Sequence, residues 1–306
     1  MFTAENWPIG ANMLSFGSTT TDGTPTLEAS SSVWASQLRQ VKALGVDQID
    51  PTDAWLPLAK LSDERVEEFR SVLDGEGMTL SSISMTRNSV VDVKNGEQNV
   101  ADALRFIDLA PSFGVSVVNT GFMQATTEAQ QKAIWFWLAD GHVDDPALRD
   151  LAIERIRTLG DAARDQGIEV SLEMYEDTYV GTADEAVAFV KDVGHEAVGL
   201  NPDIGNLVRL HREVEPWADM FEKVLPHSNF WHIKNYTRDL DPATGAYSSA
   251  PMPLKYGYIN YRQVILRALE LGYSGPFCCE HYGSDSLGVI AENVQYIRQV
   301  LASALA

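Results

Sequence analysis

Four residues of the types that bind hard metal ions lie at or near the ends of four separate apolar runs. These are Glu173 after run 168–172, Asp203 after 197–202, His232 within 229–235 and Glu280 after 276–279. Carboxylate oxygens and one imidazole nitrogen suit a hard divalent ion, so the set predicts one metal site. We expect Mn²⁺, with Mg²⁺ or Co²⁺ as alternatives. Any one of these residues alone is equally well explained as a helix cap or a surface acid, and it is their joint placement that indicates a metal.

Two cationic side chains follow His232 closely along the chain, Lys234 and Arg238. Beside a metal they would stabilise negative charge that develops on a substrate oxygen. The alternative is structural, either a solvated loop or an internal ion pair with Asp203 or Glu280.

The elements that must position these residues alternate regularly. Eight strand-like runs, each followed by a helical pattern, predict a (β/α)8 TIM barrel, an α/β fold, as a single domain over residues 1–306. The expected strands are 9–16, 46–50, 79–85, 115–120, 168–173, 197–203, 229–235 and 276–280. Glycines before successive strands are expected to end the helices, namely Gly45, Gly77, Gly114, Gly167, Gly194 and Gly272. Because active sites of such barrels lie at the carboxyl ends of the strands, the four candidate ligands are expected to converge there.

The longest interruption of this alternation is the loop after the fourth strand, at about 121–145. It contains Trp135, Trp137 and His142. The two readings are a helix packed on the outside of the barrel and a lid whose aromatic side chains face a flat substrate while His142 transfers a proton.

Composition limits the remaining possibilities. The 306 residues carry a formal net charge of −20 and are 45% apolar, which opposes nucleic-acid binding. Because no apolar run is long enough for a membrane span and no targeting segment is visible, a cytoplasmic location is expected. Cys278 and Cys279 are adjacent and are expected to be reduced packing residues.

A divalent ion beside a sugar-sized cavity supports removal of a proton from the carbon next to a carbonyl. The carboxylates or His142 would move that proton, in isomerisation, epimerisation or elimination of a keto sugar. The other readings are a metal-dependent endonuclease, which the charge disfavours, and a barrel without catalytic activity.

The order Glu173, Asp203, His232 and Glu280, with Arg238 six residues after the histidine, resembles the xylose-isomerase-like TIM barrels grouped as sugar phosphate isomerases and epimerases. The resemblance implies that these four residues bind the metal and that the two glutamates act as acid and base. Members include ketose 3-epimerases, hydroxypyruvate isomerase and inosose dehydratase. Epimerases usually have a histidine three residues after the aspartate, where this chain has Asn206.

The aromatic loop, Tyr175, Tyr179 and the ending Glu280-His281 look more like the metal-binding alpha subunit of bacterial C-glycoside deglycosidases. That resemblance implies a carbon-carbon lyase acting on 3-keto C-glycosides of aromatic aglycones, together with a small β-rich partner subunit in a hetero-oligomer. We therefore expect the lyase first, with a sugar isomerase or epimerase as the alternative. The residues expected to contact such an aryl glycoside, or a sugar, are Trp135, Trp137, Tyr175, Asn206 and His281. Those expected to act in catalysis are His142, Glu173, Glu280, Lys234 and Arg238.

Overall fold

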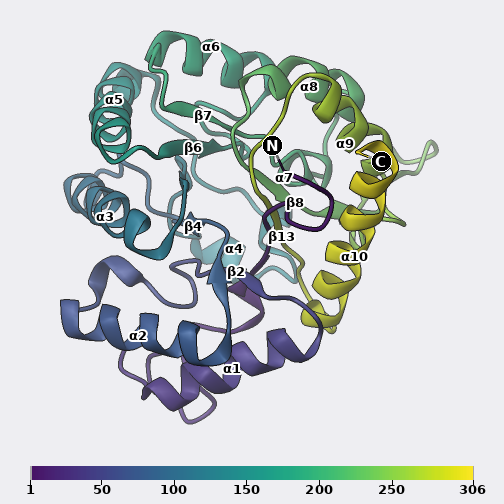
Figure 1. Cartoon of the computed structure of the whole chain (residues 1–306). Coiled ribbons are helices and arrows are strands. Elements are labelled where there is room, and N and C mark those ends of the chain that lie inside the picture. The colour runs from purple at the N-terminus through teal and green to yellow at the C-terminus, as the bar shows by residue number, and fades with distance from the viewer. Residues whose placement is uncertain (1, 306) are drawn as a thin grey trace.

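Parallel strands form the centre of the fold, and helices surround them (Figure 1). The computed structural model describes residues 2–305. The parallel strands are β1 Ile9–Asn12, β2 Gln48–Asp50, β3 Thr79–Leu80, β4 Ile83–Ser84, β5 Val117–Thr120, β6 Glu169–Glu173, β7 Val198–Asn201, β8 Trp231–Ile233 and β13 Phe277–Cys279. Together they form the eight-stranded barrel that the sequence predicts, with β3 and β4 sharing one strand position.

The longer helices follow the strands around the ring. They are α1 Ser31–Ala43, α2 Asp63–Glu76, α3 Gly96–Leu109, α5 Arg149–Gln166, α6 Ala183–Val193, α8 Trp217–Val224, α9 Tyr261–Glu270 and α10 Ser286–Ala304. Two short helices, α4 Glu128–Lys132 and α7 Gly205–Val208, lie in the loops after β5 and β7. The six glycines expected to end helices all have left-handed φ angles, between 59° and 87°, so this prediction is confirmed.

The third predicted strand, 79–85, is interrupted at Ser81 and Ser82. Their hydroxyls bond to the neighbouring strand, Ser81 Oγ donating to the Ile49 carbonyl at 3.3 Å and Ser82 Oγ to Asp50 Oδ2 at 2.5 Å. The barrel therefore consists of a five-stranded sheet ordered β3-β2-β1-β13-β8 and a four-stranded sheet ordered β4-β5-β6-β7. The first strand also ends before the predicted Phe16, because the Asn12 side chain accepts the Leu14 N–H and starts a helical turn.

The two sheets meet again between β7 and β8, where the pairing is short. One bridge joins Leu200 to Ser228, and the side chain of Asn201 then replaces the strand ladder by accepting the backbone N–H of His232 at 2.7 Å. The same Asn201 donates to Asn119 Oδ1, and Asn119 donates to Glu173 Oε2, both at 3.1 Å. This buried amide network fixes His232 relative to Glu173 across the junction.

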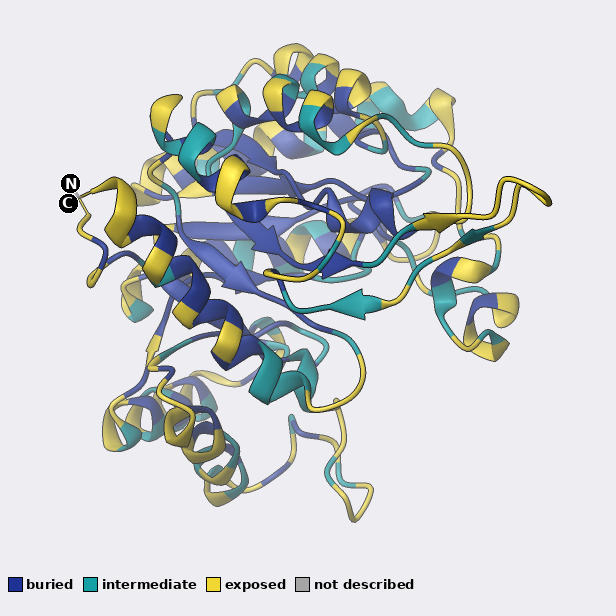
Figure 2. Ribbon diagram, turned by 90° about the vertical axis from the view of Figure 1, so that its right-hand side faces the viewer, coloured by how far each residue is buried: buried dark blue, intermediate teal, exposed yellow. Residues whose placement is uncertain are grey.

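Burial follows the barrel plan, since the barrel strands are mostly buried while the outward faces of the helices are exposed (Figure 2). Cys278 and Cys279 are buried and free, as expected. After β8 the chain forms two small antiparallel pairs. These are β9 Asn235–Tyr236 with β12 Pro251–Met252, and β10 Asp239–Leu240 with β11 Tyr247–Ser248.

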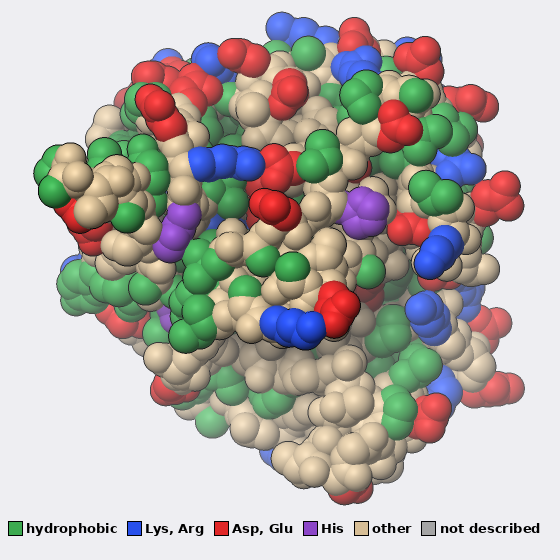
Figure 3. Space-filling model, turned by 180° about the vertical axis from the view of Figure 1, so that it is seen from behind, with side chains coloured by type: hydrophobic (Ala, Val, Ile, Leu, Met, Phe, Trp, Pro, Cys, Tyr) green, Lys and Arg blue, Asp and Glu red, His purple; other side chains and the backbone are tan. Residues whose placement is uncertain are grey.

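The surface mixes both signs of charge. On the face seen in Figure 3, acidic and basic side chains are scattered, without a continuous basic area of the kind that holds a nucleic-acid backbone. Within residues 2–305 no helix has the length and apolar character that crossing a bilayer requires.

Candidate metal centre

The four predicted ligands meet at the carboxyl ends of neighbouring barrel strands. Glu173 is the last residue of β6, Asp203 follows β7, His232 lies in β8 and Glu280 follows β13. All four are buried, and one ligand atom from each lies within 4.8 Å of those of the others. The fold brings them together because parallel strands of a barrel end at one face.

Lys234 belongs to the same cluster. Its Nζ lies 2.8 Å from Asp203 Oδ2 and 2.9 Å from Glu280 Oε1, which is the internal ion pair that the sequence offered as the alternative to an oxyanion contact. Three carboxylates face one ammonium group and one imidazole. The cluster can therefore accept further positive charge.

Burial raises the pKa of Asp203 to about 7, with Lys234 opposing the rise and the charges of Glu173 and Glu280 adding to it. Burial alone would lower the pKa of His232, but the adjacent Glu173 raises it to about 9. Without a metal the cluster thus retains protons. Because a metal ligand must offer a free lone pair, metal binding at neutral pH displaces a proton from the His232 ring.

Several buried atoms of this cluster have no hydrogen-bond partner outside the cluster, namely His232 Nδ1 and the two carboxylate oxygens of Asp203, of which Oδ2 contacts Lys234 Nζ. Polar atoms buried in this way are uncommon unless something else binds them. Nδ1 lies 3.1 Å from Glu173 Oε2 and 3.6 Å from Glu280 Oε2, so it faces the carboxylates. The residues present therefore fit a divalent cation held by oxygen atoms and one nitrogen.

A serine and an aspartate that the sequence reasoning missed hold the other side of the His232 ring. Ser84 Oγ donates to Asp50 Oδ2 at 2.7 Å and lies 3.0 Å from His232 Nε2. Because the single hydroxyl proton goes to Asp50, the hydroxyl accepts the proton on Nε2. Nδ1 is then the nitrogen left to bind a cation.

The pair Asp50 and His232 also lies near Cys278, and these three could hold a metal by distance alone. Burial raises the pKa of the Cys278 thiol well above its usual range, and Asp50 already accepts hydrogen bonds from Ser82 and Ser84. The four-residue cluster is therefore the better metal site.

Ser84→Ala is expected to weaken Mg²⁺ or Mn²⁺ binding by about 10- to 100-fold, the usual effect of losing a group that orients a ligand histidine. Titration calorimetry of metal into stripped protein measures this change, and Ser84→Thr should restore most of the affinity. Ser171→Ala is the matched control, because Ser171 is also buried in a barrel strand but its hydroxyl has no partner. Equal metal affinity in Ser84→Ala and the control would contradict the proposed role of Ser84.

Asn206, three residues after Asp203, is the residue at which the resemblance to ketose epimerases led us to expect a histidine. Its side-chain amide donates to Glu173 Oε1 at 3.1 Å and to the Met174 carbonyl at 2.9 Å. Asn206 therefore lies in contact with one candidate ligand, and its own carbonyl oxygen is buried without a partner.

The aromatic loop covers the metal cluster. Trp135 and Trp137 stack with ring centres 4.9 Å apart, and Trp137 contacts Tyr236 after β8 and Tyr282 after β13. The ammonium of Lys234 lies 5.3 Å from the centre of the Tyr282 ring. The loop thus lies over the carboxyl ends of the strands, and a substrate must displace part of it to reach the cluster.

Other predicted site residues lie outside the cluster. His142 is exposed and lines a small cavity with Tyr175 and Glu176. Arg238 donates to the backbone carbonyls of Val208 and Leu210 at 2.8 and 2.5 Å, so it braces the end of α7 instead of facing a substrate oxygen. His281 is buried next to Glu280.

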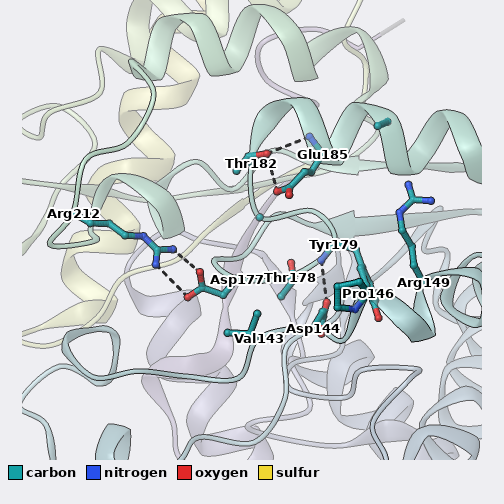
Figure 4. Close-up of a pocket in the computed structure, with 12 residues that line it drawn as sticks. Val143, Asp144, Pro146, Arg149, Asp177, Thr178, Tyr179, Thr182, Glu185 and Arg212 are labelled. Carbon is teal, nitrogen blue, oxygen red and sulfur yellow. Dashed lines mark hydrogen bonds and ion pairs between the residues drawn. The ribbon is translucent and has the colours of Figure 1, made fainter.

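A surface pocket of about 620 Å³ lies between the loop after β6, the start of α5 and the start of α6 (Figure 4). Its lining includes none of the four candidate ligands. Its polar groups are satisfied internally, because Arg212 pairs with Asp177 and Asp144 accepts the Tyr179 N–H at 2.9 Å. The Tyr179 hydroxyl donates to the Asp145 carbonyl at 2.5 Å, so this tyrosine is a bracing residue.

Fold and site define a (β/α)8 barrel with a candidate divalent-metal centre at its carboxyl-end face. A family model described as xylose isomerase-like TIM barrel matches residues 38–300. The chain belongs to this family, as the resemblance of its ligand order predicted.

Solved structures agree with this assignment. A xylose isomerase-like TIM barrel protein from Mycobacterium smegmatis, crystallised in complex with magnesium, is 72% identical over the full length of both chains, with a TM-score of 0.99. D-psicose 3-epimerase from Clostridium cellulolyticum H10, solved with D-tagatose, is 16% identical over 97% of this chain and 99% of that one, with a TM-score of 0.63. The 3-keto-D-glucoside 4-epimerase from E. coli is 12% identical over 96% and 100%, with a TM-score of 0.64. The last two share the fold, and none of the curated proteins matches the chain.

Proposed function

We propose that this protein is a divalent-metal-dependent enzyme that moves a proton at the carbon next to the carbonyl of a keto sugar, as an isomerase or epimerase. The observation that carries the proposal is the buried cluster of Glu173, Asp203, His232 and Glu280 under the aromatic loop. Family membership, the epimerases among the proteins of like fold and the magnesium in the 72% identical protein support it. Either Mg²⁺ or Mn²⁺ suits the donor set.

Each part of the chain has a distinct task in this proposal. A cation held by the four residues would supply the positive charge that stabilises negative charge developing on the sugar carbonyl oxygen. Glu173 and Glu280 come from separate strands, so one can remove a proton from carbon and the other can return one. Asn206 holds the Glu173 carboxylate, and the charge of Lys234 favours the ionised forms of Asp203 and Glu280. The aromatic loop excludes water from the charged groups.

Proton exchange in D₂O tests the proposed reaction directly. Metal-loaded protein is incubated with a panel of ketohexoses and ketopentoses, and deuterium at the carbon next to the carbonyl is followed by NMR. We expect incorporation that stops with EDTA and in Asp203→Asn, and persists in Glu169→Gln, a carboxylate on the same strand as Glu173 but at its exposed end. Metal-loaded protein that exchanges no proton in any keto sugar would refute the proposal.

A carbon-carbon lyase acting on 3-keto C-glycosides is the second candidate, and the aromatic loop favours it, since Trp135 and Trp137 offer stacking surface for an aromatic aglycone. A small β-rich partner subunit belongs to this second candidate. In it, His142 delivers the proton to the departing aromatic carbon.

His142→Gln should then lower aglycone release by about 10²-fold or more, with metal content unchanged. Chromatography of the free aglycone measures this rate. Unchanged release in the variant, or faster epimerisation of a free ketose than cleavage of any aryl glycoside, would leave only the isomerase or epimerase.

A further inference from the structure

Arg209 is a buried cation whose hydrogen bonds are only partly used. It follows α7 and is fully buried. Its Nη2 donates to both carboxylate oxygens of Glu176, at 3.1 and 3.0 Å, while Nε and Nη1 have no partner. Leaving a donor of a charged group unpaired in the interior destabilises the fold, and more so than for a neutral donor. Such donors indicate a missing acceptor.

Arg209 and a second arginine, Arg87, both contact the ring of Phe136. The guanidinium carbons of Arg87 and Arg209 each lie 4.8 Å from the centre of the Phe136 ring, on the aromatic loop. Arg87 has a left-handed φ of 55°, a conformation that costs a non-glycine residue free energy and is enriched at functional sites. Phe136 therefore occupies space next to two guanidinium groups.

The charges around this ring do not balance. Glu176 is the carboxylate paired with Arg209, and the contact of Arg87 is with a neutral group, the Gln124 carbonyl, at 3.2 Å. Two positive charges thus face one negative charge. Contacts of the guanidinium groups with aromatic faces offset only part of this charge. One further negative charge would balance the site.

The two arginines are also linked to the metal centre. Phe136 packs edge-on against Trp137, with ring centres 5.1 Å apart, and both contact Tyr282. Tyr282 in turn lies beside Lys234, which contacts Asp203 and Glu280. One aromatic layer therefore separates the arginines from the metal ligands, and a single substrate that displaced this layer would reach both.

We propose that Arg87 and Arg209 bind the carboxylate of an acidic sugar, which takes the place of the Phe136 ring. This proposal rests on the proposed function and specifies its substrate class. A guanidinium group binds two oxygens at once, which suits a carboxylate or a phosphate group. The single surplus charge matches a carboxylate better than a phosphate, which carries about −1.5 to −2 at neutral pH.

Calorimetry with matched pairs of ligands tests the proposal on the full-length, Mg²⁺-loaded protein. The probes are D-glucuronate with D-glucose, D-galacturonate with D-galactose, and D-tagaturonate with D-tagatose. We expect at least one acid to bind about 100-fold more tightly than its neutral partner, since charge-assisted hydrogen bonds are each worth about 1.5 to 3 kcal/mol. Equal binding within all three pairs, or no binding of any acid, overturns the proposal. So does tighter binding of D-tagatose 6-phosphate than of every acid.

Two variants test whether Arg87 and Arg209 cause the preference for the acid. Arg209→Gln and Arg87→Gln should each lower the preference for the acid by about 10-fold or more, while binding of the neutral sugar changes little. Arg87 is only partly buried, so its variant remains informative if removing Arg209 prevents folding. Arg212→Gln is the matched control, because Arg212 pairs with Asp177 on the surface nearby. An acid preference that survives in Arg87→Gln and in folded Arg209→Gln overturns the proposal.

Failure of this proposal and failure of the proposed function give different results. If the protein is a proton-transferring enzyme but the arginines bind no carboxylate, deuterium still enters neutral ketoses in D₂O, and the acids bind no more tightly than the neutral sugars. If the arginines bind a carboxylate but the protein is not such an enzyme, the acid preference appears and no deuterium enters any keto sugar.

Discussion

Asp203→Asn is expected to abolish metal binding while the protein stays folded. The substitution preserves the shape of the side chain but removes one of the three negative charges of the cluster, from a carboxylate whose Oδ1 has no hydrogen-bond partner and whose Oδ2 contacts Lys234. We expect the dissociation constant for Mg²⁺ or Mn²⁺ to rise by more than about 10³-fold, or about 4 kcal/mol. Titration calorimetry on EDTA-stripped protein measures the change, and elemental analysis gives the metal content after purification.

Asp144→Asn provides the control for this result. Asp144 is also a buried carboxylate near the carboxyl-end face, but it accepts the Tyr179 N–H and is not one of the four candidate ligands. Its metal affinity should equal that of the unchanged protein. Metal binding that persists at ordinary affinity in Asp203→Asn would remove the basis for a metal enzyme.

Lys234→Met is expected to destabilise the metal-free protein by about 3 to 5 kcal/mol, the usual cost of removing one partner from a buried ion pair. The ammonium lies between Asp203 and Glu280, and without it both carboxylates stay buried next to Glu173. Urea unfolding in EDTA measures the loss. Saturating Mg²⁺ should recover part of it, because the metal supplies positive charge to the same carboxylates.

Lys223→Met is the matched control for this substitution. Lys223 also joins two carboxylates, with its Nζ 2.9 Å from Asp184 Oδ1 and 2.6 Å from Glu215 Oε1, but its side chain is 37% exposed, against 2% for Lys234. Solvent screens such pairs, so little or no change in stability is expected. If Lys234→Met and Lys223→Met unfold at the same urea concentration in EDTA, Lys234 does not offset the charge of the cluster.

The barrel and its four candidate ligands could be predicted because both depend on short-range patterns in the sequence. Apolar runs alternate with helical patterns, and glycines with left-handed φ end the helices. A polar residue at the carboxyl end of a buried parallel strand must then lie at the carboxyl-end face of the barrel. Glu173, Asp203, His232 and Glu280 meet there for that reason.

Contacts between side chains that are far apart in the sequence could not be predicted from such short-range patterns. Ser84 reaches His232 over 148 positions of sequence, and Arg209 reaches Glu176 over 33. No local pattern distinguishes Ser84 from Ser171, although the first is bonded to a candidate ligand and the second has no partner. Arg238 illustrates the opposite case, since its spacing after His232 matched the family while its guanidinium binds the carbonyls after α7.

The sequence alone thus determined the fold, the order of the ligands and the kind of ion that they suit, because strand periodicity and donor chemistry are properties of individual segments. Tertiary structure decided which nitrogen of His232 faces the carboxylates, that Lys234 lies among them, and that Phe136 lies against Arg87 and Arg209. These features depend on distances between side chains from different segments, and such distances exist only once the barrel has closed and the loop after β5 has packed over it.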